Sequence, residues 1–188
     1  MKDKIPKMFK GQTVACIASG PSLTKSDCEL IEQSKIPTIA INMSWKMARF
    51  AKIIYAGDFV WWQHYRHEID IDAEQWTCCK RSADDYKINY HDKRGAYNSG
   101  LRAVELALEM GASKVLLLGY DASVDNGTHW HADYKLTRNP DELRCHKWLR
   151  YFDHLRGKNI INCAPNSALT QFPKMTLEMA LELENSIS

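Results

Sequence analysis

The sequence predicts an α/β protein of Rossmann-like type, with a mostly parallel sheet, helices on both faces and a lid loop. Three observations carry this prediction. Short apolar runs alternate with amphipathic stretches of about ten to fifteen residues. Runs such as "KVLLLGY" (114–120) are apolar without alternation, as in strands buried on both faces. Most runs end in small or hydrogen-bonding residues. We expect a single domain over residues 1–188, with the lid at about 122–139.

The first half of the chain supplies most of the expected strands. In order, we predict a strand at 13–18, a helix at 23–34, strands at 36–42 and 52–58, a helix at 59–69 and a strand at 75–81. The aromatic face of the 59–69 helix (Trp61, Trp62 and Tyr65) favours a core position, and would suit an interface in a homo-oligomer if it were exposed. Residues 80–97 mix Lys, Arg, Asp and Tyr, which favours a solvated loop over a polyanion-binding segment.

The second half has the clearest pattern. Leu101, Val104 and Leu108 share one face of a helix predicted from Ser99 to Met110, and Gly111 ends it. The remaining predicted elements are a strand at 115–118, the loop at 122–139, a helix at 140–155, a strand at 159–165 and a helix from about 174.

Composition excludes several classes of protein. A net charge of +2 gives no broad cationic field for nucleic acid, and the N-terminus has no apolar core of a signal peptide. No window reaches 18 uninterrupted apolar residues, so we expect no membrane span. The six cysteines include no Cys-x-x-Cys pair, which disfavours a zinc ribbon or redox motif and favours a cytoplasmic location.

The ends of the predicted strands form a candidate binding site. The first strand runs into Ser19-Gly20-Pro21-Ser22, where Gly20 permits close backbone approach and Pro21 stiffens the turn. The hydroxyls and the following helix N-terminus could hold a phosphate, or the segment could be only a turn with a helix cap. The other strand ends contribute Asn42, Asp58, Asp121, Asn166 and Ser167. No Walker loop is present, which excludes a P-loop ATPase.

Two further groups could carry chemistry. Ser99 and Gly100 open the amphipathic helix and could contact an anion or a ribose, although Asn98 or Ser99 could equally serve as an N-cap. His129 and His131 could supply a general base near neutral pH. His-x-His alone is a weak zinc signal, and we predict no resident metal.

Three blocks resemble a known family. "IASGPSL" (17–23), "NSGLRAVELALEMGASKVLLLGYD" (98–121) and "CAPNSALTQFPK" (163–174) are similar to segments of the bacterial sialyltransferases that use CMP-sialic acid. The same blocks resemble a wider Rossmann-like group, which includes motility-associated flagellin-modifying proteins, an archaeal hydroxymethylpterin pyrophosphokinase and many small viral members.

The resemblance implies a nucleotide-sugar-dependent glycosyltransferase with a CMP- or UDP-linked donor. Ser19–Ser22, Asn42, Ser99, Gly100 and Asp121 would then face the nucleotide or the donor sugar, with Asn166 and Ser167 in the same cleft. His131 or His129 would deprotonate a hydroxyl of a glycan, small molecule or nucleobase. The two lid tyrosines of the sialyltransferases have no clear counterpart here, and Tyr134 is the one candidate substitute.

Two alternatives stay open. In the first, the same nucleotide site performs Mg²⁺-dependent phosphoryl or pyrophosphoryl transfer, which requires Asp58 and Asp121 to converge, with Asp133 as a further candidate. In the second, the protein is a non-catalytic module that binds a nucleotide or a protein partner.

Overall fold

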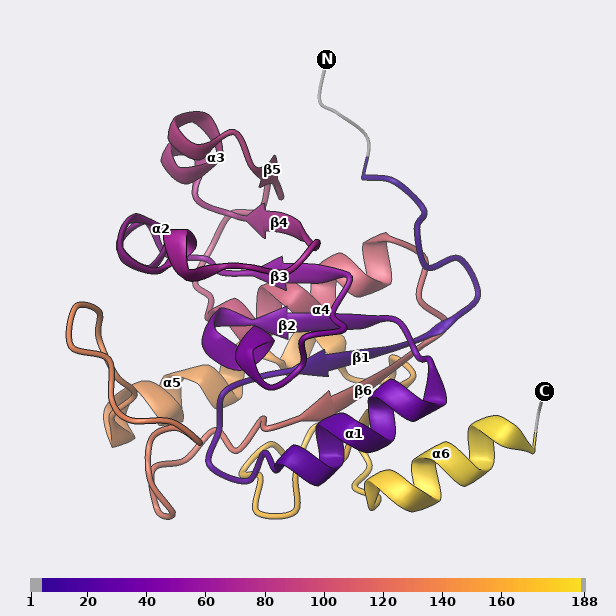
Figure 1. Cartoon of the computed structure of the whole chain (residues 1–188). Helices are drawn as coiled ribbons and strands as arrows, with labels where there is room; N and C mark the ends of the chain where they lie inside the picture. The colour runs from indigo at the N-terminus through magenta and orange to yellow at the C-terminus, as the bar shows by residue number, and fades with distance from the viewer. Residues whose placement is uncertain (1–4, 187–188) are drawn as a thin grey trace.

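The computed structural model describes residues 5–186 and contains a seven-stranded sheet in which every pair of neighbours is parallel (Figure 1). The strand order is β5-β4-β3-β2-β1-β6-β7. The strands are β1 (Thr13–Ile17), β2 (Thr38–Ile41), β3 (Ile53–Tyr55), β4 (Glu74–Thr77), β5 (Asn89–Tyr90), β6 (Lys114–Leu118) and β7 (Ile160–Asn162). The predicted fold class is therefore confirmed.

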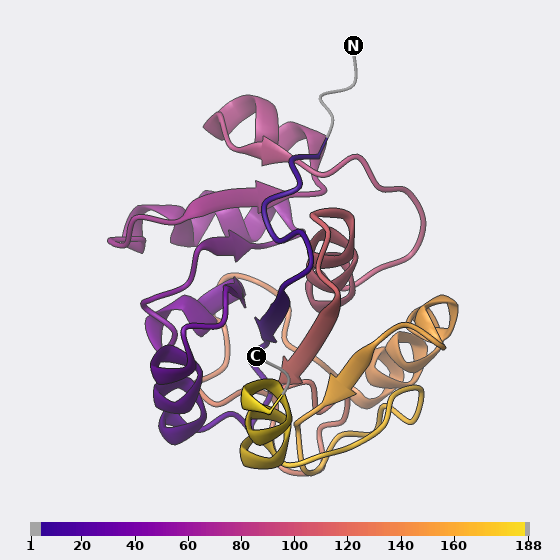
Figure 2. The same ribbon diagram turned by 90° about the vertical axis from the view of Figure 1, so that its right-hand side faces the viewer.

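Helices cover both faces of this sheet, as Figure 2 shows. The α-helices are α1 (Lys25–Ser34), α2 (Phe59–Tyr65), α3 (Lys80–Tyr86), α4 (Ser99–Glu109), α5 (Glu142–Tyr151) and α6 (Leu177–Asn185). Short 3₁₀ helices are η1 (Asn42–Lys46), η2 (Arg66–Glu68) and η3 (Asp153–Leu155). Side chains of α1, α2 and α6 share one apolar cluster, whereas those of α4 share another with Phe152.

The strands are buried on both faces because their side chains alternate between the two clusters. In β1, Val14 and Cys16 pack on the α4 side, while Ala15 and Ile17 pack on the α1 side. Leu116 in the neighbouring strand is also fully buried. This arrangement explains why the sequence shows continuous apolar runs rather than polar alternation.

Residues 80–97 correct one expectation, because they contain α3 and β5 rather than a loop alone. The aromatic ring of Tyr86 stacks on Phe59 with centroids 5.8 Å apart, and the Arg81 guanidinium lies 3.9 Å from the Phe59 centroid. This packing on α2 offsets the polar composition that had favoured a solvated loop. The helix predicted at 140–155 is also divided, into α5 and η3.

The chain changes direction across the sheet at β1. Strands β1 to β5 follow one another toward one edge, and α4 then returns the chain to β6, on the other side of β1. Such a switch point leaves a crevice at the carboxyl ends of the two strands. The 122–139 segment lies at the carboxyl ends of the strands, the end toward which the strand arrows of Figure 1 point.

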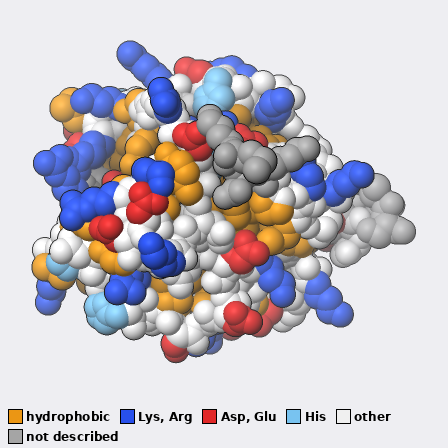
Figure 3. All heavy atoms as spheres, turned by 90° about the horizontal axis from the view of Figure 1, so that it is seen from above, with side chains coloured by type: hydrophobic (Ala, Val, Ile, Leu, Met, Phe, Trp, Pro, Cys, Tyr) orange, Lys and Arg blue, Asp and Glu red, His pale blue; other side chains and the backbone are white. Residues whose placement is uncertain are grey.

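The surface agrees with the modest net charge. On the face drawn in Figure 3, basic and acidic side chains are interspersed rather than gathered into one field. Among the helices of residues 5–186, none has the length and apolar character needed to cross a membrane.

Candidate functional site

A cavity of about 960 Å³ opens at the carboxyl edge of the sheet. Its walls come from the ends of β1, β2, β3 and β6, the N-terminus of α4, the 122–139 segment and α5. The residues predicted from the sequence that line it are Ser19, Gly20, Asn42, Asp58, Ser99, Gly100, Asp121 and His129. The structure thus gathers residues from four strand ends, a helix N-terminus and the 122–139 segment around one space.

The turn after β1 is bound to the end of β6. A Cβ atom at Gly20 would lie 2.0 Å from Oδ2 of Asp121 and 2.4 Å from the Gly119 carbonyl oxygen. The Gly20 N–H donates to that carbonyl at 2.9 Å, and the Ser22 hydroxyl donates to Asp121 Oδ2 at 2.7 Å. Glycine is therefore required at position 20 by the packing of the protein itself.

Asp121 presents an unused acceptor in this unit. Its side chain is 3% exposed, and its second oxygen, Oδ1, is buried without a hydrogen-bond partner. Burial raises the pKa of the carboxyl group, while the two bonds from Ser22 act in the opposite direction. A buried oxygen at a cavity wall is suited to accept a hydrogen bond from a hydroxyl group of a ligand.

The N-terminus of α4 forms another part of the wall. The Asn98 side chain caps the helix by accepting from the Leu101 N–H at 2.7 Å. The Ser99 hydroxyl oxygen instead accepts from the Gly57 N–H at 3.0 Å and so ties α4 to the end of β3. Because Asn98, Ser99 and Gly100 all line the cavity, the positive end of the helix dipole lies at its wall.

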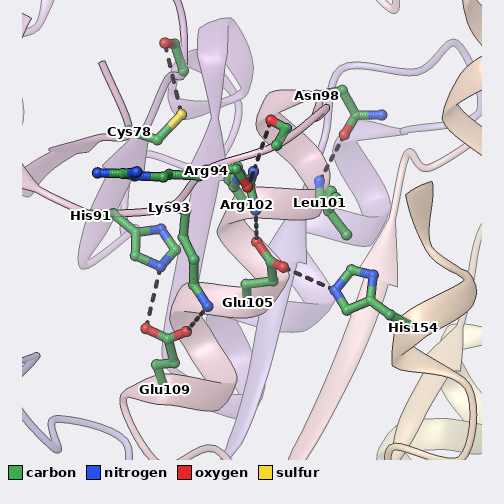
Figure 4. Close-up of polar contacts among 12 residues, drawn as sticks. Cys78, His91, Lys93, Arg94, Asn98, Leu101, Arg102, Glu105, Glu109 and His154 are labelled. Atoms are coloured by element: carbon green, nitrogen blue, oxygen red, sulfur yellow. Dashed lines mark hydrogen bonds and ion pairs between the residues drawn. The ribbon is translucent and has the colours of Figure 1, made fainter. Parts of the chain in front are cut away.

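A polar network fixes the chain that leads into this helix, as Figure 4 shows. Arg102 is 3% exposed; it pairs with Glu105 at 2.6 Å and donates to the Arg94 carbonyl at 2.7 Å. His154 lies 2.9 Å from the other oxygen of Glu105. A buried Arg with several partners holds the entering segment, and therefore the cap, against α4.

Backbone strain is concentrated at the same edge. Four non-glycine residues among residues 5–186 have positive φ, and two of them, Lys35 and Lys87, are ordinary helix C-caps. The other two, Asn42 (φ 52°) and Ala122 (φ 53°), line the cavity at the ends of β2 and β6. Oδ1 of Asn42 is also buried without a partner. Strained residues of this kind persist where the surroundings impose them, often at ligand sites.

The 122–139 segment brings the two histidines together. The rings of His129 and His131 stack with centroids 4.7 Å apart and planes 7° apart. Burial lowers the pKa of both rings, so both are neutral near pH 7. His129 lines the cavity and His131 does not. Tyr134, also in the wall, packs edge-on against both rings.

Several predicted residues lie outside the wall. Pro21 and Ser22 belong to the turn behind Gly20, and Asn166 is exposed to solvent. The Ser167 hydroxyl donates to the Tyr120 carbonyl at 2.6 Å, which joins the chain after β7 to the end of β6. Ser22 and Ser167 thus act on neighbouring wall residues through hydrogen bonds.

The cavity also contains residues that the sequence did not single out. Lys135, Arg138 and Arg144 add basic groups, and Arg144 holds the Asn139 carbonyl oxygen at 2.9 Å. Arg144 also opposes the increase that burial causes in the pKa of Asp58. These residues belong to no motif. Only a helical register that places Arg144 on the inner face of α5 could have indicated it.

The three carboxylates considered for the magnesium alternative do not all lie in the cavity wall. Asp58 and Asp121 line the cavity, whereas Asp133 is exposed and accepts from the Thr128 hydroxyl. Within the described range, 5–186, no group of three or more His, Cys, Asp and Glu side chains is arranged to hold a metal ion.

The comparisons with known proteins bear on the fold. No protein-family model and no curated protein matches the sequence. Among solved structures, the chain is similar to the sialyltransferase CstII from Campylobacter jejuni, in complex with a substrate analogue, cytidine-5′-monophosphate. The TM-score is 0.58 at 13% identity, over 89% of this chain and 86% of that chain. The chain therefore has a sialyltransferase-like α/β fold.

Proposed function

We propose that this protein is a nucleotide-sugar-dependent glycosyltransferase that acts on a hydroxyl acceptor. The observation that carries the proposal is the cavity of about 960 Å³, which joins four strand ends, a helix N-terminus and a histidine. Its volume lies near the upper end of the usual range for ligand pockets and leaves room for a sugar nucleotide. The fold shared with a sialyltransferase supports the same reaction class.

The donor would lie across the strand ends. Its phosphate would take the N–H groups at the start of α4, where the helix dipole favours an anion, with Arg144 as a second positive group. A ribose hydroxyl would donate to the unused Oδ1 of Asp121. Because the similar sialyltransferase structure contains cytidine-5′-monophosphate, a CMP-linked sugar is the first donor to test.

The acceptor hydroxyl would lose its proton to His129. Its oxygen would form a bond to the anomeric carbon as the bond from that carbon to the phosphate oxygen breaks, and the phosphate would leave with the nucleotide. Of the two candidate histidines, His129 is favoured because it lines the cavity. A neutral imidazole with a lowered pKa is in the protonation state that a base requires.

Ligand-induced thermal stabilisation tests the proposal. CMP, CDP, UMP, UDP, GDP, ADP and ATP are titrated against the protein with and without Mg²⁺. A nucleotide at 100 times its Kd should stabilise the fold by about 2.7 kcal/mol. We expect stabilisation by a pyrimidine nucleotide in the absence of Mg²⁺. A response only to ATP with Mg²⁺ would favour phosphoryl transfer instead, and no response to any nucleotide would overturn the proposal.

A matched pair of variants locates the binding. Arg144→Met removes a basic group from the cavity wall, whereas Arg150→Met removes an exposed one from the same helix, α5. Only Arg144→Met should weaken nucleotide binding. Equal loss in both variants would point to nonspecific attraction by the charge of the helix.

A further inference from the structure

Asn139 is held in one orientation by the main chain of Tyr134. Its Oδ1 atom accepts from the Tyr134 N–H at 2.8 Å, and its Nδ2 atom donates to the Tyr134 carbonyl at 3.0 Å. If the amide were flipped, its NH₂ group would face the Tyr134 N–H and its oxygen would face the Tyr134 carbonyl. These two contacts therefore determine which atom is oxygen. The Arg144 bond to the Asn139 carbonyl oxygen fixes the same residue to α5.

This orientation determines where the proton of His129 is. Nε2 of His129 lies 3.2 Å from Oδ1 of Asn139. An amide oxygen can only accept, so Nε2 must carry a hydrogen and donate it. The two lone pairs of Oδ1 are then used by the Tyr134 N–H and by His129. In the neutral ring, the lone pair that can take a proton belongs to Nδ1.

We infer that Asn139 is a positioning residue, which holds His129 in the Nε2–H form and makes Nδ1 the proton-accepting atom of the site. The role of this arrangement in catalysis rests on the proposed function. Which nitrogen of His129 carries the hydrogen is a property of the free protein. When Nδ1 takes a proton, Nε2 still donates to Asn139, so no hydrogen bond of this arrangement has to break.

The other groups around the ring act mainly on its charge, although the Ser19 carbonyl is also a second acceptor for a ring N–H. The stacked His131 disfavours a positive charge on His129, while the Asp133 carboxylate and the Ser19 carbonyl favour one. Nδ1 of His131 lies 2.7 Å from the Ala132 carbonyl oxygen, so it carries its own hydrogen, and the Nε2 lone pair of that ring is buried without a partner. The Tyr134 ring contacts His129 edge-on, with centroids 5.0 Å apart.

Nitrogen-15 NMR of histidine-labelled free protein tests the inference without any substrate. Above the titration midpoint of His129, we expect an observable Nε2–H proton and an unprotonated Nδ1. In Asn139→Ala, that proton should exchange with water too fast to observe. In Asn139→Asp, the carboxylate keeps the acceptor and adds a negative charge, so the Nε2–H should persist while the pKa of His129 rises.

A control variant separates positioning from loop packing. Asp133→Asn removes a charge near His129 but leaves Asn139 in place, so it should lower the titration midpoint and keep the Nε2–H. A neutral wild-type ring protonated at Nδ1, as donation to the Ser19 carbonyl would require, would overturn the inference. An unchanged His129 pKa in folded Asn139→Asp would do the same.

Activity provides a second readout once a donor is identified. Asn139→Ala should lower kcat by about 10- to 100-fold with little change in KM, because the base is present but not oriented. If the NMR result holds and no nucleotide binds, the proposed function fails while the Asn139–His129 assignment stands.

Discussion

The two walls of the cavity are built in different ways. The strand-end wall is built on the sheet itself. Gly20, which has no side chain, packs directly against Asp121 and donates its N–H to the Gly119 carbonyl, and the Ser22 hydroxyl adds a short bond to Asp121. The 122–139 wall contains no helix or strand. It is held mostly by side chains, chiefly Asn139 and the stacked histidines, together with a main-chain bond from the Trp130 N–H to the Ser19 carbonyl at 3.1 Å. The first wall therefore belongs to the folded core of the sheet, and the second depends on a few exchangeable contacts.

This difference predicts how substitutions act. A change where the turn after β1 packs on the end of β6 must disturb that packing, so it should cost stability first. A change in the 122–139 wall can leave the sheet intact, so it should alter the chemistry first. The following tests compare the two walls, from the largest expected effect to the smallest.

The largest effect is expected at His129. His129→Gln keeps an N–H at the position of Nε2, and so the bond to Asn139, but removes the ring lone pair. Transfer to the acceptor should fall by about 10²- to 10⁴-fold, equivalent to roughly 3–5 kcal/mol. Thermal stability and donor binding should change little. The measurement is the initial rate of nucleotide release from the donor.

His131→Asn is the matched control. Its amide N–H can replace the Nδ1 donor to the Ala132 carbonyl while removing the ring lone pair. Activity should remain within a few-fold of wild type. Loss of activity in His131→Asn, but not in His129→Gln, would exchange the roles of the two histidines.

The next effect is on stability, at Gly20. Gly20→Ala would place a methyl group 2.0 Å from Asp121 Oδ2, so the turn must separate from β6. We expect a loss of about 3 kcal/mol or more in the free energy of unfolding, measured in urea. In Gly100→Ala the nearest atom, Cε1 of Tyr120, is 3.0 Å away, and helix propensity offsets the crowding. That variant should stay within about 1 kcal/mol; equal losses in the two would show that the β1 turn can adapt.

The strand-end wall was largely predictable from sequence, because chain order and periodicity determine it. Continuous apolar runs separated by helices imply a parallel sheet, and a parallel sheet brings strand ends together. Gly20, Asn42, Asp58 and Asp121 are found in this way, since each lies within three residues of the end of a strand. The sequence could not show that Gly20 is small because Asp121 fills the space beside it.

The other wall was less accessible to sequence reasoning. Within 122–139, tertiary contacts decide which side chains face the cavity, and no period relates Arg144, on α5, to His129. The role of Asn139 rests on two bonds to one residue five positions earlier, which leave no pattern in composition. The same limit applies to residues 80–97, where packing on Phe59 accounts for a helix that composition disfavoured.

A smaller effect is expected in the pH dependence of stability, at Asp121. Burial raises its pKa in the folded protein, so the folded state holds the proton to higher pH than the unfolded chain. Stability should fall as pH rises from the unfolded pKa of about 3.9 to the folded pKa, by at most about 1.4 kcal/mol per pH unit. Asp121→Asn should remove this slope in urea unfolding.

Ser22→Ala should have the opposite effect to Asp121→Asn on the pH dependence of stability. The Ser22 bonds lower the Asp121 pKa, so their loss extends the range of pH over which stability falls. If Ser22→Ala and Asp121→Asn flatten the profile equally, the slope originates elsewhere, for example at Asp58, whose pKa burial also raises.

The smallest effect concerns the strain at Ala122, where the two walls meet. An alanine at φ 53° costs about 1–2 kcal/mol relative to an unstrained residue, and a glycine there would relieve this cost but add freedom to the unfolded chain. Ala122→Gly should therefore raise the free energy of unfolding by about 0.5–1 kcal/mol. Lys35→Gly, at φ 60° in the exposed C-cap of α1, should gain a similar amount.

Nucleotide binding separates the two variants: it should weaken only in Ala122→Gly, because only Ala122 orients the chain between Asp121 and the 122–139 segment. Equal binding in both would mean that the strain at the end of β6 is a by-product of the fold and does not preorganise the site.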